Sequence, residues 1–146
     1  MAPKAKILIA GNEKEVVENL DELLRSYEFD TVSTCNGAEA VEAVRRERPD
    51  LVLFDIIMPG LDSYLACQIL RRDSANLNLP IVILSGFAEE SAVISALECG
   101  ADDYLTKPFL DKEIFKSIER LLSCARQGLL PSQMHLKKPE NSRISP

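Results

Sequence analysis

Two hydrophobic patterns recur along the chain, short runs that are apolar at every position and longer stretches with apolar residues at helical spacing. The runs Ile7–Ala10, Leu51–Phe54 and Ile81–Leu84 contain only apolar residues. A run of this kind is typical of a parallel strand that is buried on both faces of a sheet. The longer stretches place apolar residues three or four positions apart and charged residues between them, which is the pattern of an amphipathic helix. The chain is therefore predicted to alternate strands with helices.

The full pattern predicts five strands and five helices. The expected strands are Lys6–Ala10, Asp30–Cys35, Leu51–Asp55, Ile81–Ser85 and Asp103–Thr106. The expected helices are Glu13–Tyr27, Ala38–Arg48, Leu61–Arg72, Glu89–Cys99 and Leu110–Ala125. Strict alternation implies right-handed crossovers and a parallel sheet, hence an α/β fold. Because the three fully apolar runs should lie at the centre, we expect a flavodoxin-like, doubly wound sheet of strand order 2-1-3-4-5, flanked by the five helices.

The pattern also indicates where the folded domain ends. With 146 residues, the chain is long enough for one well-cored domain and short for two. Periodicity fades after Arg126, so we expect a domain over residues 4–126 and a flexible tail, or a truncated linker, over 127–146. This tail is net basic and rich in proline, and its lone histidine, His135, is expected to be a solvated bystander.

Charge and cysteine content narrow the class of protein. The net charge of -6 argues against a general nucleic-acid binder. We find no apolar stretch long enough for a membrane span and no signal peptide, so no membrane partner is expected. The four cysteines lie far apart, without metal-ligand or redox-motif spacing, as expected for free thiols in a reducing cytoplasm. A soluble, cytoplasmic protein is the expectation.

Candidate chemistry lies at the carboxyl ends of the predicted strands. Asp55 closes a buried strand, which by itself is more often a turn or capping residue than a functional one. In the strand order 2-1-3-4-5, however, Asn12, Asp55, Ser85 and Lys107 should converge on one rim of the sheet. An open α/β sheet places its binding sites at that rim. The convergence is the argument for function.

Three segments carry a resemblance to a known family. They are DLVLFDIIMPGLD around Asp55, PIVILSG ending near Ser85, and GADDYLTKPF ending at Phe109. In this order and spacing they resemble the receiver domains of two-component response regulators, of the single-domain, chemotaxis-like type. The resemblance covers Lys4–Arg126 without an evident gap.

The resemblance implies a role for each residue of the site. Asp55 would accept a phosphoryl group from the phosphohistidine of a partner kinase and form an acyl phosphate. Lys107 would pair with Asp55 or with a phosphoryl oxygen. Ser85 would donate to another phosphoryl oxygen, and Tyr104 would be the aromatic switch that moves with it. The peptide bond Lys107–Pro108 matches one that the family holds cis. The alternatives without a function are that Ser85 is only a turn residue, Tyr104 a half-buried aromatic residue of a strand and Lys107 a surface charge.

The expected Mg²⁺ site departs from the family pattern. Where the family has two adjacent acids after the first strand, this chain has Gly11 and Asn12. The remaining candidate ligands are Asp55, Asn12 and the backbone carbonyl of Ile57, with Glu13 as a substitute. Two unit charges about 4 Å apart interact by about 4 kcal/mol at an effective dielectric near 20. We therefore predict Mg²⁺ binding weakened by about one order of magnitude or more, or ~1.4 kcal/mol.

Two functions remain open at the sequence level. The first is a receiver that accepts a phosphoryl group on Asp55 from a sensor histidine kinase or phosphotransfer protein. It would then present an altered face, formed by Glu89–Cys99, Asp103–Thr106 and Leu110–Ala125, to a downstream protein or to a second copy in a homodimer. The second is a degenerate receiver, a protein-interaction module that acts without phosphorylation because its metal site is weakened.

An enzyme is disfavoured. Phosphatases of the haloacid-dehalogenase type use an acid two residues after their nucleophile, and here that position is Ile57. A nucleotide-binding protein is also disfavoured, because no glycine-rich phosphate loop follows the first strand. The chain would assist only its own phosphorylation.

Overall fold

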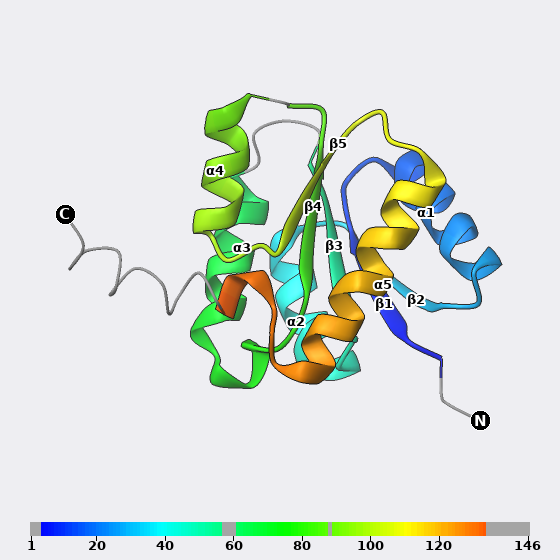
Figure 1. Ribbon diagram of the computed structural model, residues 1–146. Helices are drawn as coiled ribbons and strands as arrows, with labels where there is room; N and C mark the ends of the chain where they lie inside the picture. The colour runs from blue at the N-terminus through cyan, green and yellow to red at the C-terminus, as the bar shows by residue number, and fades with distance from the viewer. Residues whose placement is uncertain (1–3, 57–60, 88, 134–146) are drawn as a thin grey trace, which may run out of the picture.

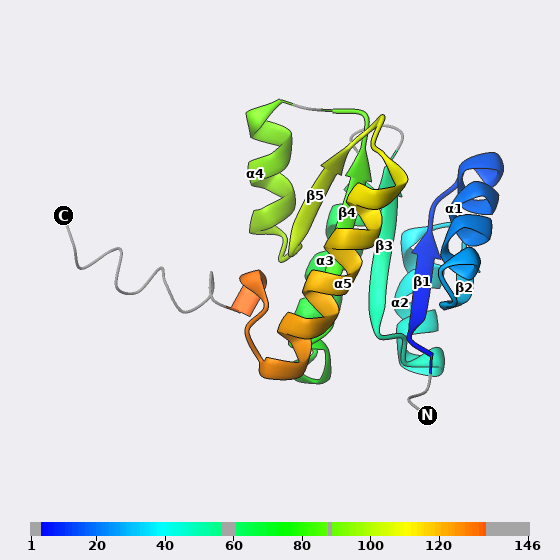
Figure 2. The same ribbon diagram turned by 45° about the vertical axis from the view of Figure 1, so that its right-hand side comes forward.

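A five-stranded parallel sheet forms the centre of the protein, with helices on both faces (Figures 1 and 2). The computed structural model describes residues 4–56, 61–87 and 89–133. The strands are β1 (Lys6–Ala10), β2 (Asp30–Thr34), β3 (Leu51–Ile56), β4 (Ile81–Ser85) and β5 (Asp103–Thr106). The helices are α1 (Lys14–Ser26), α2 (Gly37–Glu47), α3 (Leu61–Arg72), α4 (Glu90–Glu98) and α5 (Asp111–Gln127), with a short 3₁₀ helix at Ser74–Asn76. Ile57 and most of the predicted tail lie outside the described residues.

The strand order is β2-β1-β3-β4-β5, which confirms the predicted flavodoxin-like arrangement. All four strand pairs are parallel, and every residue of β3 and β4 is buried. The edge strands β2 and β5 are only partly buried. The fully apolar runs therefore form the centre of the sheet, as burial on both faces requires.

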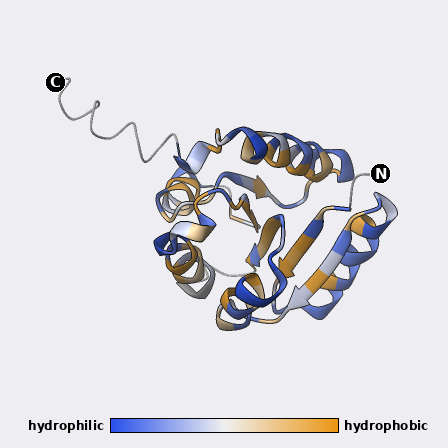
Figure 3. Ribbon diagram, turned by 90° about the horizontal axis from the view of Figure 1, so that it is seen from below, coloured by the Kyte–Doolittle hydropathy of each residue, from blue (hydrophilic) through white to orange (hydrophobic). Residues whose placement is uncertain are grey.

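Alternate residues of the central strands contribute to two separate cores, because successive side chains of a strand point to opposite faces. Helices α2, α3 and α4 cover one face, and α1 and α5 cover the other. Seen along the sheet, apolar residues concentrate in the central strands (Figure 3). Among the described residues, no helix has the length and apolar character needed to cross a bilayer.

The segment that follows α5 packs against the domain, although the sequence predicted a flexible tail from residue 127. Gly128 ends α5 in the left-handed conformation, with φ of 70°. Leu130 is then fully buried in the core on the α1 and α5 side. The backbone N–H of Ser132 donates to Asp102 Oδ1 over 2.9 Å. The packed domain therefore extends past the predicted boundary, since Leu130 is buried in the core and Ser132 is hydrogen-bonded to Asp102.

A buried ion pair organises this end of the sheet. Asp102 Oδ2 accepts from Arg71 Nη2 over 2.7 Å and from the backbone N–H of Ile81 over 2.9 Å, while its other oxygen accepts from Ser132. The Arg71 guanidinium also donates to three backbone carbonyls, those of Asn76, Leu79 and Gly100. A buried ion pair is stabilising only when such additional hydrogen bonds satisfy it. This one joins α3, the start of β4, the residue before β5 and the segment after α5.

Candidate functional site

The carboxyl ends of four strands bring the candidate residues to one edge of the sheet. Ala10, the last residue of β1, is in register with Phe54 of β3, so Gly11 follows at the level of Asp55. Ile56 is in register with Ser85, and Ser85 with Thr106, the residue before Lys107. The convergence expected from the strand order is thus present in the backbone.

Asp55 is the buried acid of this edge. The residue is 3% exposed, and its Oδ1 atom forms an ion pair with the Lys107 ammonium. Its Oδ2 atom has no hydrogen-bond partner among the described residues. Buried polar atoms are normally satisfied, so an oxygen without a partner indicates an atom that a ligand or an incoming group can contact.

Gly11 lies directly against Asp55. A Cβ atom built on Gly11 would lie 3.0 Å from Asp55 Cβ, 3.2 Å from Val17 Cγ2 and 3.4 Å from Asp55 Oδ2. The first two separations are tighter than ordinary van der Waals contact, so any side chain here would require a neighbour to move. The glycine thus permits a close approach of the backbone to the carboxylate.

Lys107 is aimed at the acid by its backbone. Its N–H donates to the carbonyl of Ser85 over 2.7 Å, which anchors the residue at the end of β4. The following peptide bond, Lys107–Pro108, is cis, as the resemblance predicted. The side chain is 26% exposed, so its ammonium reaches the buried carboxylate from the solvent side.

Ser85, Phe87 and Tyr104 form a hydrogen-bonded relay. The Ser85 hydroxyl oxygen accepts from the backbone N–H of Phe87 over 3.0 Å. The carbonyl of the same Phe87 accepts from the Tyr104 hydroxyl over 2.6 Å. The two predicted switch residues are therefore linked through one residue of the β4–α4 loop. Sequence reasoning missed Phe87, since a role played by backbone atoms leaves no side-chain signal.

The described residues offer few side chains that could bind a metal ion at this edge of the sheet. Asn12 and Glu13 are both exposed and lie just past the end of β1. Within the described ranges, no group of three or more His, Cys, Asp or Glu side chains could hold a metal ion. The free Asp55 Oδ2 fits a magnesium ligand, because Mg²⁺ accepts one or two protein carboxylates and keeps several waters. A site is feasible here, with a single buried carboxylate.

Tyr64 of α3 lies beside Tyr104. Its hydroxyl donates to the carbonyl of Ala92 in α4 over 3.5 Å. Partial burial, with Tyr104 nearby, raises the pKa of Tyr64. The ring is thus a neutral contact between α3 and α4, next to the relay.

Comparison with known proteins agrees with this geometry. Residues 7–119 match the family model described as the response regulator receiver domain. The DNA-binding response regulator MtrA of Mycobacterium tuberculosis is 39% identical over 119 residues, which is 82% of this chain and 51% of that protein. The chain spans about half the length of the curated relatives that it matches.

Solved structures show the same similarity. The BeF₃-activated N-terminal receiver domain of RstA from Klebsiella pneumoniae has 32% sequence identity and a TM-score of 0.72, covering 80% of this chain and 97% of that one. The signal receiver domain of a signal transduction histidine kinase from Syntrophus aciditrophicus has 34% identity and a TM-score of 0.74, covering 82% and 90%. The chemotaxis protein CheY4 of Vibrio cholerae, at 21% identity, shares the fold.

Proposed function

We propose that this chain, which belongs to the family of response regulator receiver domains, accepts a phosphoryl group on Asp55 from the phosphohistidine of a sensor histidine kinase or a phosphotransfer protein. A receiver domain is a signalling phosphoacceptor rather than an enzyme, and it implies a histidine kinase as partner. The proposal rests on one observation. The buried Asp55 carboxylate has one oxygen on Lys107 and the other without a hydrogen-bond partner in the described part of the chain.

In the proposed transfer, an Asp55 oxygen attacks the phosphorus atom. A P–O bond forms as the P–N bond to the histidine breaks, and the leaving imidazole recovers a proton from solvent. A carboxylate is a weak nucleophile, and the reaction depends on offsetting charge on the phosphoryl oxygens. Lys107 supplies one cation already in contact with the acceptor, and it would move from Asp55 Oδ1 to a phosphoryl oxygen.

Receiver domains usually bind Mg²⁺, which when bound offsets the negative charge of the phosphoryl group. In this chain Asp55, Asn12 and the carbonyl of Ile57 would hold the ion, with Glu13 as a further candidate. Gly11 and Asn12 stand where the family has acids, so we propose a site that binds Mg²⁺ weakly. The absence of a three-carboxylate cluster from the described residues supports this.

The relay offers a route from the site to the surface. If the Ser85 hydroxyl turns to a phosphoryl oxygen, it gives up the Phe87 N–H, and the loop that carries Phe87 is released. The Tyr104 hydroxyl then loses its acceptor on the same residue. We propose that this exchange repositions Tyr104 and alters the face formed by α4, β5 and α5.

That face is the proposed contact for a downstream protein or for a second copy in a homodimer. Ile94 and Leu97 of α4 are large apolar side chains that are 46% and 38% exposed. The chain's net charge of -6 favours a protein over a nucleic acid as its partner. We propose a cytoplasmic setting, as expected from the spacing of the four cysteines in the sequence.

A second function, a receiver that acts by docking without phosphorylation, is favoured by the contact between Gly11 and Asp55. Because Gly11 and Asn12 carry no negative charge, Lys107 pairs directly with Asp55. This ion pair can hold the resting conformation. In that case the resting conformation, and signalling with it, would not depend on the supply of phosphodonor.

Intact-mass spectrometry separates the two functions. The full chain would be incubated with acetyl phosphate at graded Mg²⁺ concentrations, beside an Asp55→Asn control. If the chain is a receiver, the wild-type chain alone should gain the mass of one phosphoryl group. The fraction of chains that carry this group should increase with the Mg²⁺ concentration. A wild-type chain that stays unmodified at high Mg²⁺ would favour the docking module, and equal labelling of both chains would exclude Asp55 as the acceptor.

A further inference from the structure

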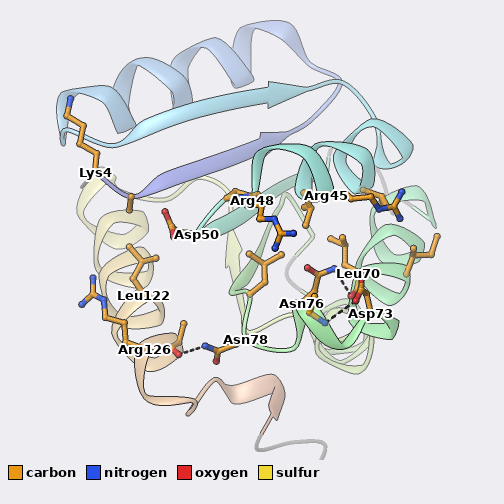
Figure 4. Close-up of a pocket in the computed structure, with 18 residues that line it drawn as sticks. Lys4, Arg45, Arg48, Asp50, Leu70, Asp73, Asn76, Asn78, Leu122 and Arg126 are labelled. Carbon is orange, nitrogen blue, oxygen red and sulfur yellow. Dashed lines mark hydrogen bonds between the residues drawn. The ribbon is translucent and has the colours of Figure 1, made fainter. Parts of the chain in front are cut away.

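A cavity of about 800 Å³ opens at the end of the sheet opposite to Asp55 (Figure 4). It lies between α2, α3, the short 3₁₀ helix and α5, where the strands begin. Its floor is apolar, and the side chains that form it are those of Val44, Leu70, Leu79, Leu122 and Ala125. Nothing in the proposed phosphoryl transfer uses this cavity.

Arg48 stands over this floor. Figure 4 shows its guanidinium pointing into the middle of the cavity, while Lys4, Arg45 and Arg126 lie at the margin. Arg48 ends α2 with φ of 49° and ψ of 60°, the left-handed conformation. Glycine is the usual residue at such a helix end, because other L-residues adopt this conformation at a cost in free energy. Strain of this kind is typical of positions where a side chain is required for function.

In the described part of the chain, the acids that line the cavity bond to backbone N–H groups and form no ion pair with Arg48. Asp50 Oδ2 accepts from the backbone N–H of Lys6 over 2.8 Å, and Asp73 Oδ1 accepts from that of Ala75 over 3.0 Å. Among the described residues, none of the ion pairs within 4.0 Å includes Arg48. The central guanidinium is therefore available to an anion.

The balance of charge points the same way. Four basic side chains line the cavity against two acidic ones, although the whole chain has a net charge of -6. They are Lys4, Arg45, Arg48 and Arg126, against Asp50 and Asp73. A concave, locally positive site in an acidic protein attracts small anions by focusing the field.

We propose that this cavity binds a small organic anion with an apolar body, whose acid group pairs with Arg48 and whose apolar part covers the floor. The volume lies within the roughly 300–1,000 Å³ typical of small-molecule sites. An inorganic anion would leave the apolar floor uncovered. A neutral apolar ligand would remove water from the Arg48 guanidinium without giving it a partner, which is unfavourable. The inference is independent of the proposed phosphoryl transfer.

A pair of matched dyes tests the proposal on the full chain. The probe is 8-anilinonaphthalene-1-sulfonate, and N-phenyl-1-naphthylamine is its uncharged counterpart with the same rings. In a fluorescence titration we expect the sulfonate to bind the wild-type chain and to bind Arg48→Gly about ten-fold more weakly or worse. Binding of the neutral dye should not weaken in Arg48→Gly, because the guanidinium that this dye would leave without water is gone.

The melting temperature of Arg48→Gly shows whether this variant is folded. The variant relieves the left-handed strain, so its melting temperature should rise by about 3 °C. The control is Arg46→Gln on the same helix, because Arg46 is exposed, pairs with Glu47 and does not line the cavity. This control should bind the sulfonate as the wild-type chain does. Labelling of Asp55 by acetyl phosphate should be unaffected by Arg48→Gly, so the two proposals can fail separately.

Three results would overturn the proposal. The first is a wild-type chain that does not bind the sulfonate. The second is equal binding by wild type and Arg48→Gly, which would mean that Arg48 does not hold the anion, or an equal loss in Arg46→Gln, which would mean general attraction to surface charge. The third is displacement of the sulfonate by an equal concentration of inorganic phosphate, which would show that the apolar body contributes nothing.

Discussion

Restoring an acid at position 11 tests the account of the metal site. In Gly11→Asp the new Cβ would lie 3.0 Å from Asp55 Cβ and 3.2 Å from Val17 Cγ2. Insertion of atoms into so tight a space typically costs about 1–3 kcal/mol. The added carboxylate would also repel Asp55 by about 4 kcal/mol at a separation near 4 Å and a dielectric near 20, a repulsion that the Lys107 cation largely offsets.

We therefore expect Gly11→Asp to be less stable than the wild-type chain by about 2–4 kcal/mol in the absence of Mg²⁺. Gly11→Ala introduces the Cβ without the charge and should lose only about 1–2 kcal/mol. The second carboxylate should strengthen Mg²⁺ binding by about ten-fold or more, or ~1.4 kcal/mol, so that saturating Mg²⁺ recovers part of the lost stability.

Urea unfolding with and without Mg²⁺ measures the free energy of unfolding of the wild-type chain, Gly11→Asp and Gly11→Ala. Calorimetric titration measures the Mg²⁺ affinity of the same three proteins. Mg²⁺ affinity that is the same in Gly11→Asp and Gly11→Ala would refute the reasoning, because the missing charge would then not limit the site. A wild-type affinity as high as that of receivers with both acids would refute it as well, and would indicate Glu13 as a substitute ligand.

Three further predictions concern other parts of the molecule. Tyr104→Phe removes the hydroxyl that bonds to the Phe87 carbonyl, so hydrogen exchange of the β4–α4 loop should accelerate while phosphoryl labelling is retained; unchanged exchange would argue against the relay. Leu130→Ala should lower the free energy of unfolding by about 3 kcal/mol in urea, whereas truly tail-like behaviour would give no change. Burial raises the pKa of the Cys67 thiol to about 12 from 9.0. Between pH 9 and pH 12 the folded state keeps the proton that the unfolded chain loses. The free energy of unfolding should therefore fall as the pH rises through this range, by about 1.4 kcal/mol per pH unit. Cys67→Ala should make the free energy of unfolding less dependent on pH in this range. An equal pH dependence in the variant and the wild-type chain would show that Cys67 is not its cause.

The sequence alone was sufficient to determine the sheet and the edge at which chemistry is expected. Runs such as Ile81–Leu84 are apolar at every position, and only a strand covered on both faces buries them all, so their place at the centre follows from pattern. The strand order then places Asp55 and Lys107 at one edge, since carboxyl ends of parallel strands coincide.

Only the tertiary structure decided how backbone atoms link Ser85 to Tyr104, which ion pair forms at the other end of the sheet and how the chain packs after α5. The Phe87 relay uses backbone atoms that every residue has, and the Arg71–Asp102 ion pair joins residues 31 positions apart. The packing of Leu130 depends on a core that exists only after the sheet, α1 and α5 have come together. Hydrophobic periodicity is a property of neighbouring residues along the chain, whereas these contacts depend on distances that folding creates. That difference explains why the fold and the pairing of Asp55 with Lys107 could be expected from the sequence, whereas these other contacts could not.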